Sequence, residues 1–130
     1  MTAKTVRDLT DAELRGKRAV VRADFNVPLD DQRAITDDTR IKAALPTLRF
    51  LLERGARPIV LSHLGRPKAK FDPRFSLDVV AVRLQQRYGV PIAFVAASDT
   101  DEALQRSKSL RAGEVLLLEN TRFLPGEEAN

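Results

Sequence analysis

Short apolar runs recur along this chain, and stretches with helical periodicity separate one run from the next. The runs lie at residues 18–23, 57–62, 90–95 and 114–118. Most of them are close to continuously apolar, which is typical of strands buried on both faces of a sheet. Strands that alternate with helices predict a parallel sheet with helices on both faces. We therefore expect an α/β fold in three layers.

The stretches between these runs predict amphipathic helices. Pro46 lies inside the first long pattern, so a bend or a later start of that helix is expected. Asp37, Asp38 or Thr39 is expected to cap its start, and Ser76 the start of the next. The resulting architecture is a mostly parallel, Rossmann-like sheet. We expect a short helical turn at residues 10–15 and helices at about residues 41–52, 77–88 and 99–111.

The C-terminal residues do not complete an element of this pattern. Residues 125–130 are polar and close neither a helix nor a strand. We therefore expect a fragment of a longer protein, in which residues 1–130 form a partial N-terminal domain. Four strands alone are expected to leave the last apolar strand, residues 114–118, partly uncovered.

Charge and composition narrow the class of protein. The chain has 22 Lys and Arg against 18 Asp and Glu, which gives a net charge of +4 and a pI of about 9.8. This balance favours anionic ligands, but acidic residues are interleaved throughout, so nucleic acid is not expected as the partner. The absence of cysteine excludes disulfides and thiolate metal sites. No apolar run resembles a signal peptide or approaches the roughly 20 residues of a membrane-spanning helix, so we expect a cytoplasmic protein with no membrane partner.

Polar side chains follow three of the predicted strands at the point where each strand ends. Because the carboxyl ends of parallel strands share one edge of a sheet, we expect these side chains to lie close together. Arg40, in the first turn of the following helix, is expected at the same edge. The other members are Asp24 and Asn26 after the first strand, His63 and Arg66 after the second, and Asn120 and Arg122 after the fourth.

Such a set favours a small, highly anionic ligand. Guanidinium groups present a fixed planar fork to two oxygens and never lose their charge. Helix N-termini at the same edge are expected to add backbone N–H donors. Asp24 can accept a hydrogen bond from a ligand hydroxyl, which favours a hydroxylated anion over bare phosphate. Convergent cations would also stabilise the charge that spreads over a phosphoryl group during its transfer.

Each candidate also has an ordinary structural explanation, and none decides the function alone. Their shared position at one predicted edge is what favours a binding site. The ordinary explanations are a structural histidine for His63, a solvated helix residue for Arg40, a turn cap for Asp24, a soluble basic loop for Arg66 with Lys68, Lys70 and Arg74, and an ion pair of Arg122 with Glu119.

Several common catalytic and cofactor motifs are missing. The sequence has no Gly-x-x-x-x-Gly-Lys-Ser/Thr loop and no Gly-x-Gly-x-x-Gly, so no nucleotide cradle is visible. It has no His-x-x-x-His or paired-carboxylate metal motif, and one histidine supports no Ser/His/Asp set. We expect a chain that holds an anionic substrate but neither a metal nor the nucleotide.

Four motifs resemble a known family in their order and spacing. They are VRADFNVP at residues 21–28, DTRI at 38–41, SHLGRP at 62–67 and LLENTRF at 117–123. Together they resemble the N-terminal, substrate-binding domain of the phosphoglycerate kinase family, over essentially the whole chain. Ala23 stands where the family usually has Val, and Thr121 where it often has Leu. Neither position is expected to touch ligand.

The resemblance implies a reversible, glycolytic phosphoryl transfer from 1,3-bisphosphoglycerate to Mg-ADP, which gives 3-phosphoglycerate and Mg-ATP. Arg40 would be the catalytic residue, close to the reacting carboxyl end, where it would steady the transferring phosphoryl group. The remaining substrate-binding residues implied are Asp24, Asn26 and the backbone of Phe25 for the glycerate, and His63, Arg66 and Arg122 for the other phosphate, with Leu64 and Gly65 shaping the turn.

Length is where the chain departs from the family. Family members are several times longer and bind Mg2+ with ADP or ATP in a C-terminal domain, which is expected to be absent here together with the hinge and a further phosphate-binding arginine. We expect a monomer that binds 3-phosphoglycerate weakly at best and does not catalyse the transfer alone. The alternative is a basic α/β domain that binds nucleic acid or a partner protein. That alternative predicts aromatic residues interleaved with cations, but aromatic residues are only 5% of the sequence.

Overall fold

A computed structural model describes residues 11–65, 73–96 and 101–121. Helices and strands alternate along the chain as predicted. Within these ranges no helix is both long enough and apolar enough to cross a membrane. The elements are α1 (Asp11–Leu14), β1 (Arg18–Arg22), α2 (Thr39–Glu53), β2 (Arg57–Leu61), a 3₁₀ turn (Pro73–Phe75), α3 (Asp78–Tyr88), β3 (Ile92–Val95), α4 (Asp101–Ser109) and β4 (Val115–Leu118).

The four strands form one parallel sheet in the order β1-β2-β4-β3. β4 therefore lies between β2 and β3, and all four of its residues are buried. The expectation that this last strand is partly uncovered is wrong. Among the described strands, the exposed apolar residue is Val20 on β1, at 67% exposure, because β1 is an edge strand and α4 packs over β3 and β4.

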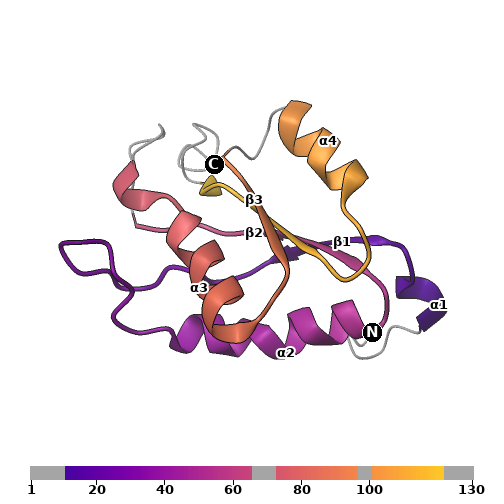
Figure 1. The fold of residues 1–130 in the computed structure, drawn as a ribbon, viewed down its shortest axis with the longest axis horizontal. Coiled ribbons are helices and arrows are strands. Elements are labelled where there is room, and N and C mark those ends of the chain that lie inside the picture. Colours follow the sequence, from indigo (N-terminus) through magenta and orange to yellow (C-terminus); the bar gives the residue numbers. More distant parts are fainter. Residues whose placement is uncertain (1–10, 66–72, 97–100, 122–130) are drawn as a thin grey trace, which may run out of the picture.

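Helices cover both faces of the sheet, which confirms the three-layer prediction. Figure 1 shows α2 and α3 together on one face and α4 on the other. Alternate residues of the central strands enter two separate cores, as the pleat of a strand requires. Val60 and Leu117 pack with the helices α2 and α3, whereas Ile59 and Leu116 pack with Ala103 of α4.

α2 differs from the expectation raised by its proline. The helix begins at Thr39 and runs through Pro46 to Glu53, so the later start is wrong. Pro46 is exposed, while Leu45 and Leu48 on the same helix are buried. Since proline lacks an N–H, it leaves the carbonyl of Lys42 without its helical donor, and that carbonyl belongs to an exposed residue. Packing of the apolar face outweighs the one missing bond.

The predicted ends of the other elements are corrected by one or two residues. The N-cap residue of α3 is Leu77 and not Ser76, although the Ser76 hydroxyl accepts a 3.3 Å hydrogen bond from the Asp78 N–H. α4 ends at Ser109, and the chain then turns through Gly113 at a φ of 91°. Gly89 ends α3 in the left-handed conformation. Thr10, the first residue of the predicted helical turn at residues 10–15, lies outside the described residues.

Candidate functional site

The exits of β1, β2 and β4 meet at one edge of the sheet, as the sequence predicted. The Ala23 N–H donates to the Leu61 carbonyl at 3.0 Å, which extends the β1–β2 pairing past the end of β1. The Thr121 N–H donates to the Ser62 carbonyl at 2.9 Å and so joins β4 to β2. The polar segments that follow these strands are therefore fixed to one another by backbone hydrogen bonds.

Ser62 fixes the turn that follows β1. It is 2% exposed, and its Oγ accepts a 2.9 Å hydrogen bond from the Phe25 N–H. The Phe25 side chain is completely buried in the core, and the Phe25 backbone carbonyl accepts a 2.8 Å hydrogen bond from the Val27 N–H. Both backbone groups of Phe25 are thus paired within the protein, and Phe25 holds the loop against the core. A serine directly after an apolar strand was the only sequence signal for this contact.

Asn26 joins the loop after β1 to the turn after β2. Its Oδ1 accepts a 2.8 Å hydrogen bond from the Gly65 N–H. Gly65 has a φ of 63°, a conformation that favours glycine. A Cβ at this position would lie 2.3 Å from Cδ1 of Phe75. The backbone therefore approaches Phe75 as closely as only glycine permits.

Arg40 projects from the first turn of α2 toward the same loop. Its Nε lies 3.5 Å from Oδ2 of Asp24, and its Nη1 donates to the carbonyl of Asn26. The side chains of Arg40 and Asp24 are 50% and 61% exposed, so both remain accessible to a ligand. Asp24 also accepts a 3.1 Å hydrogen bond from the Asn26 N–H. The structure thus brings together a cation and a carboxylate that the sequence had only placed at the same edge.

Two open cavities adjoin Arg40. One of about 570 Å³ is lined by Arg40 together with Asn26 and Thr39. A second, of about 330 Å³, is lined by Arg40, Asp24 and Arg22. A small polyanion that enters either cavity would contact the Arg40 guanidinium. The arrangement supplies charge and hydrogen bonds for a hydroxylated anion.

At the N-termini of α2 and α3, one backbone N–H each is already bonded to a carboxylate. Asp37 Oδ1 accepts hydrogen bonds from the Thr39 N–H at 2.9 Å and from the Thr39 hydroxyl at 2.6 Å, and these bonds lower the pKa of Asp37. Glu119 Oε1 accepts a 2.8 Å bond from the Leu77 N–H, just before α3. The expected contribution of these helix ends to ligand binding is therefore reduced, because these N–H groups already have partners.

Glu119 and Asn120 are structural members of the β4 exit. Glu119 is 2% exposed, and its Oε2 accepts a 2.6 Å bond from the Ser76 hydroxyl. Asn120 is completely buried and donates to the carbonyls of Leu64 at 2.7 Å and Phe75 at 2.9 Å. Asn120 lies at the polar edge as predicted, and its amide donates to the turn that follows β2 and to the Phe75 carbonyl.

The structure describes seven of the nine predicted site residues. His63 is partly buried directly after β2, whereas the side chain of Leu64 is only 2% exposed and belongs to the core. Arg74 is a further cation near the edge, where it lines a cavity of about 390 Å³ with Asn26 and Gly65. The run of cations in the preceding loop was the sequence signal for Arg74. Arg66 and Arg122 lie outside the described residues, as do Lys68 and Lys70.

In the part of the chain that the structure describes, no group of three or more His, Cys, Asp or Glu side chains is arranged to hold a metal ion. The acidic residues of the edge instead bond to backbone N–H groups and to Arg40. The Arg40 guanidinium can bind an anion directly, and the Asp24 carboxylate can accept a hydrogen bond from a hydroxyl group.

Comparison with known proteins gives one family. The family model described as phosphoglycerate kinase matches residues 9–130. The chain is 52% identical to the phosphoglycerate kinase of Herpetosiphon aurantiacus and 53% identical to that of Chloroflexus aggregans, with 100% of this chain and 32% of each relative covered. It therefore spans about a third of the length of these curated relatives.

Solved structures agree with the sequence matches. The phosphoglycerate kinase of Pyrococcus horikoshii superposes with a TM-score of 0.77 at 31% identity, over 86% of this chain and 27% of that one. The enzyme from Coxiella burnetii gives a TM-score of 0.67 at 38% identity, over 85% and 27%. The parallel sheet and its helices are thus shared with these structures.

Proposed function

The chain belongs to the phosphoglycerate kinase family, and we propose that the edge formed by the β1, β2 and β4 exits binds 3-phosphoglycerate and 1,3-bisphosphoglycerate. The observation that carries this proposal is the Asp24–Arg40 pair, held at 3.5 Å beside two open cavities. A guanidinium binds carboxylate or phosphate oxygens, and a carboxylate accepts a hydrogen bond from the glycerate hydroxyl.

Arg40 is the residue assigned to the reaction itself. At the carboxyl end of the substrate, its fixed positive charge would stabilise the charge that spreads over the transferring phosphoryl group. The salt bridge to Asp24 and the bond to the Asn26 carbonyl support this role, because they orient the guanidinium before any ligand arrives. Orientation in advance lowers the entropy that binding must overcome.

The remaining contacts follow the motif resemblance. Asp24 and Asn26 hold the glycerate. The resemblance adds the backbone of Phe25, but both of its backbone groups already have partners within the protein, so we assign Phe25 to fixing the loop instead. His63 holds the non-transferring phosphate together with Arg66 and Arg122, and Leu64 and Gly65 shape the turn that carries His63. The Asn26–Gly65 hydrogen bond supports this division, because it sets the glycerate loop and the phosphate turn at a constant separation.

We assign the complete reaction to a protein of the full length of these relatives, of which this chain spans about a third. Mg-ADP and Mg-ATP would be bound by the portion of the relatives that this chain does not match. We propose that this protein is a cytoplasmic monomer in which residues 1–130 form the substrate-binding site and contain no nucleotide site. The alternative of nucleic-acid binding predicts affinity for an oligonucleotide that falls steeply with salt, and no contact described above favours it.

Calorimetric titration of the chain with 3-phosphoglycerate tests the proposal. Arg40→Ala is expected to weaken binding about tenfold or more, since it removes a charge-assisted hydrogen bond. Arg106→Ala, an exposed arginine on the opposite helix α4, removes the same charge and is expected to change affinity less than twofold, the scale of a distant surface charge. Equal effects of the two variants, or no binding by the wild type, would contradict the assignment. A coupled assay is expected to show no turnover by the chain alone.

A further inference from the structure

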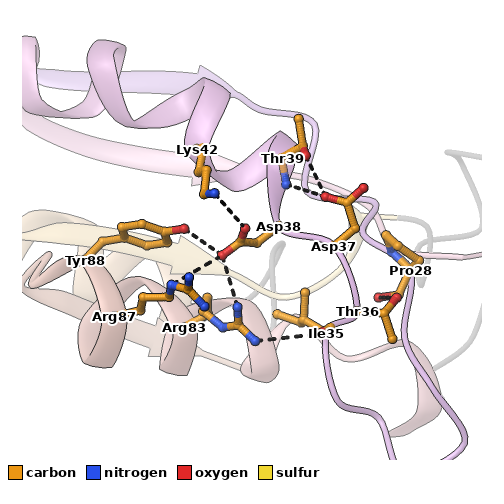
Figure 2. A network of polar contacts seen from close by, with 10 residues as sticks. All are labelled: Pro28, Ile35, Thr36, Asp37, Asp38, Thr39, Lys42, Arg83, Arg87 and Tyr88. Atoms are coloured by element: carbon orange, nitrogen blue, oxygen red, sulfur yellow. Dashed lines mark hydrogen bonds and ion pairs between the residues drawn. The ribbon is translucent and has the colours of Figure 1, made fainter.

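The buried carboxylate of Asp38 lies at the centre of a polar cluster that the proposed function does not use. Its side chain is 10% exposed. Oδ2 accepts a 2.6 Å hydrogen bond from the Tyr88 hydroxyl and a 3.0 Å bond from Arg83. Lys42 and Arg87 complete the cluster at 3.7 Å and 3.9 Å. Figure 2 shows these four side chains converging on Asp38 from α2 and α3.

The cluster fixes the start of α2 to α3. Asp38 is the N-cap residue of α2, and its carbonyl accepts the first helical hydrogen bond, from the Lys42 N–H at 3.0 Å. Tyr88 and Arg83 belong to α3, so their bonds to Asp38 cross between the two helices. The hydrogen bond from Tyr88 is the main cause that lowers the pKa of Asp38, and Arg83 lowers that pKa further.

α3 also holds the loop that leads from β1 to α2. Arg83 donates to the Ile35 carbonyl at 3.5 Å. Arg33 donates to the Ser76 carbonyl at 3.0 Å and to Asp78 at 2.8 Å. The loop is therefore fixed to the beginning and the middle of α3. Any change in the Asp38 contacts would act at the junction where this loop enters α2.

Arg40 lies two residues after Asp38, in the turn that the cluster orients. Buried Ile41 anchors the same turn to the core, so loss of the cluster is expected to tilt the turn and not to unfold it. The contacts of Arg40 with Asp24 and with the Asn26 carbonyl leave little tolerance for such a tilt. A shift of less than 1 Å at a group that contacts a reacting substrate is sufficient to weaken its action strongly.

We propose that Asp38, held by Tyr88 and Arg83, is a positioning residue that sets where the Arg40 guanidinium meets the anionic substrate. This inference rests on the proposed function of Arg40 and adds residues that do not touch the ligand. The cluster replaces helix-capping by the Asp38 side chain, which makes no hydrogen bond to the N–H groups of its own helix. Its carboxylate is used instead to orient the turn against a second helix.

A double-mutant cycle on the chain tests this role. Asp38→Asn keeps the size of the side chain and an oxygen for the Tyr88 hydroxyl, but removes the charge that pairs with Arg83. We expect it to weaken 3-phosphoglycerate binding about fivefold, within the range of coupled neighbours. In an Arg40→Lys background the same change is expected to have almost no further effect, because the group that Asp38 positions is already gone. Additive effects would overturn the proposal.

A second readout does not depend on ligand. The Nε–Hε signal of Arg40 in 1H–15N NMR spectra is expected to shift in Asp38→Asn and, less, in Tyr88→Phe. Leu110→Ala, which removes a buried side chain from the α4 core, is the control for general destabilisation and is expected to leave that signal unchanged. An unshifted Arg40 signal in Asp38→Asn would overturn the positioning role. Failure of the wild type to bind 3-phosphoglycerate would instead contradict the proposed function, and the NMR signal would still decide the role of Asp38.

Discussion

The Gly65 N–H donates a 2.8 Å hydrogen bond to Oδ1 of Asn26 across 39 residues of sequence. This bond joins the exits of β1 and β2, the two strands that carry most of the described site residues. The turn after β2 also needs glycine at this position, because Gly65 has a φ of 63° and faces the Phe75 ring. The geometry of the candidate site therefore depends on one backbone donor and one side-chain amide.

Gly65→Ala is expected to destabilise the chain and to weaken 3-phosphoglycerate binding. The left-handed backbone alone costs about 1 kcal/mol for a residue with a Cβ, and the 2.3 Å contact with Phe75 adds a clash. Gly16→Ala is the matched control, because Gly16 has a φ of 71° and an added Cβ there would meet nothing within 4 Å. Urea unfolding and calorimetry measure both effects. A stability loss in Gly65→Ala no larger than that in Gly16→Ala would argue against the close approach.

Asn120→Ala is expected to reduce stability by about 2–4 kcal/mol, because the buried carbonyl of Leu64 and the part-buried carbonyl of Phe75 lose their donor. The turn that carries His63 is then held less firmly, and its amide hydrogens are expected to exchange faster. Hydrogen exchange followed by NMR checks this. Gln105→Ala, on the exposed side of α4, should leave both properties unchanged. Unaltered exchange in the turn of Asn120→Ala would show that other contacts hold it.

Stability is expected to fall at both extremes of pH because of the Asp38–Tyr88 pair. The pKa of Asp38 is lowered from 3.8, so its ionised form is stabilised by folding, and this contribution is present above pH 3.8 and lost as pH falls through the lowered pKa. The pKa of Tyr88 is raised from 10.0, chiefly by its hydrogen bond to Asp38. The stabilisation by its neutral form is present below pH 10.0 and lost as pH rises through the raised pKa.

Urea midpoints measured across this pH range check the prediction. Asp38→Asn is expected to flatten the acid limb, and Tyr88→Phe to flatten the alkaline limb and part of the acid limb. Asp78→Asn removes an exposed carboxylate that pairs with Arg33 and serves as the control. If Asp38→Asn leaves the acid limb as steep as in the wild type, other carboxylates govern acid unfolding.

The sequence was sufficient for the layers of the fold and for the edge at which the site lies. Both follow from local patterns: apolar runs predict strands, and polar residues directly after parallel strands share an edge. Asp24, Asn26 and Arg40 were found in this way, and the structure brings them into contact. The residues at the ends of the elements shifted by one or two positions, because tertiary contacts decide where a strand or helix stops.

The contacts that support the edge were not predictable from local patterns. Glu119 bonds to Ser76 and to the Leu77 N–H across more than 40 residues, and nothing in the sequence near either partner signals the other. The same holds for Asp38 and Tyr88, which are 50 residues apart. The place of β4 inside the sheet is equally non-local, since consecutive strands need not be neighbours. These long-range pairs explain why Glu119 was interpreted only as a partner for Arg122.

The most direct test of the account is a 1H–15N NMR titration of the chain with 3-phosphoglycerate, repeated with sulfate. We predict that the largest 3-phosphoglycerate shifts occur at the amides of Asp24, Asn26, His63 and Gly65 and at Nε of Arg40, that α4 is unaffected, and that sulfate shifts fewer of these signals. Absence of shifts at this edge, or an identical response to sulfate, would contradict the claim that the edge recognises a phosphorylated glycerate.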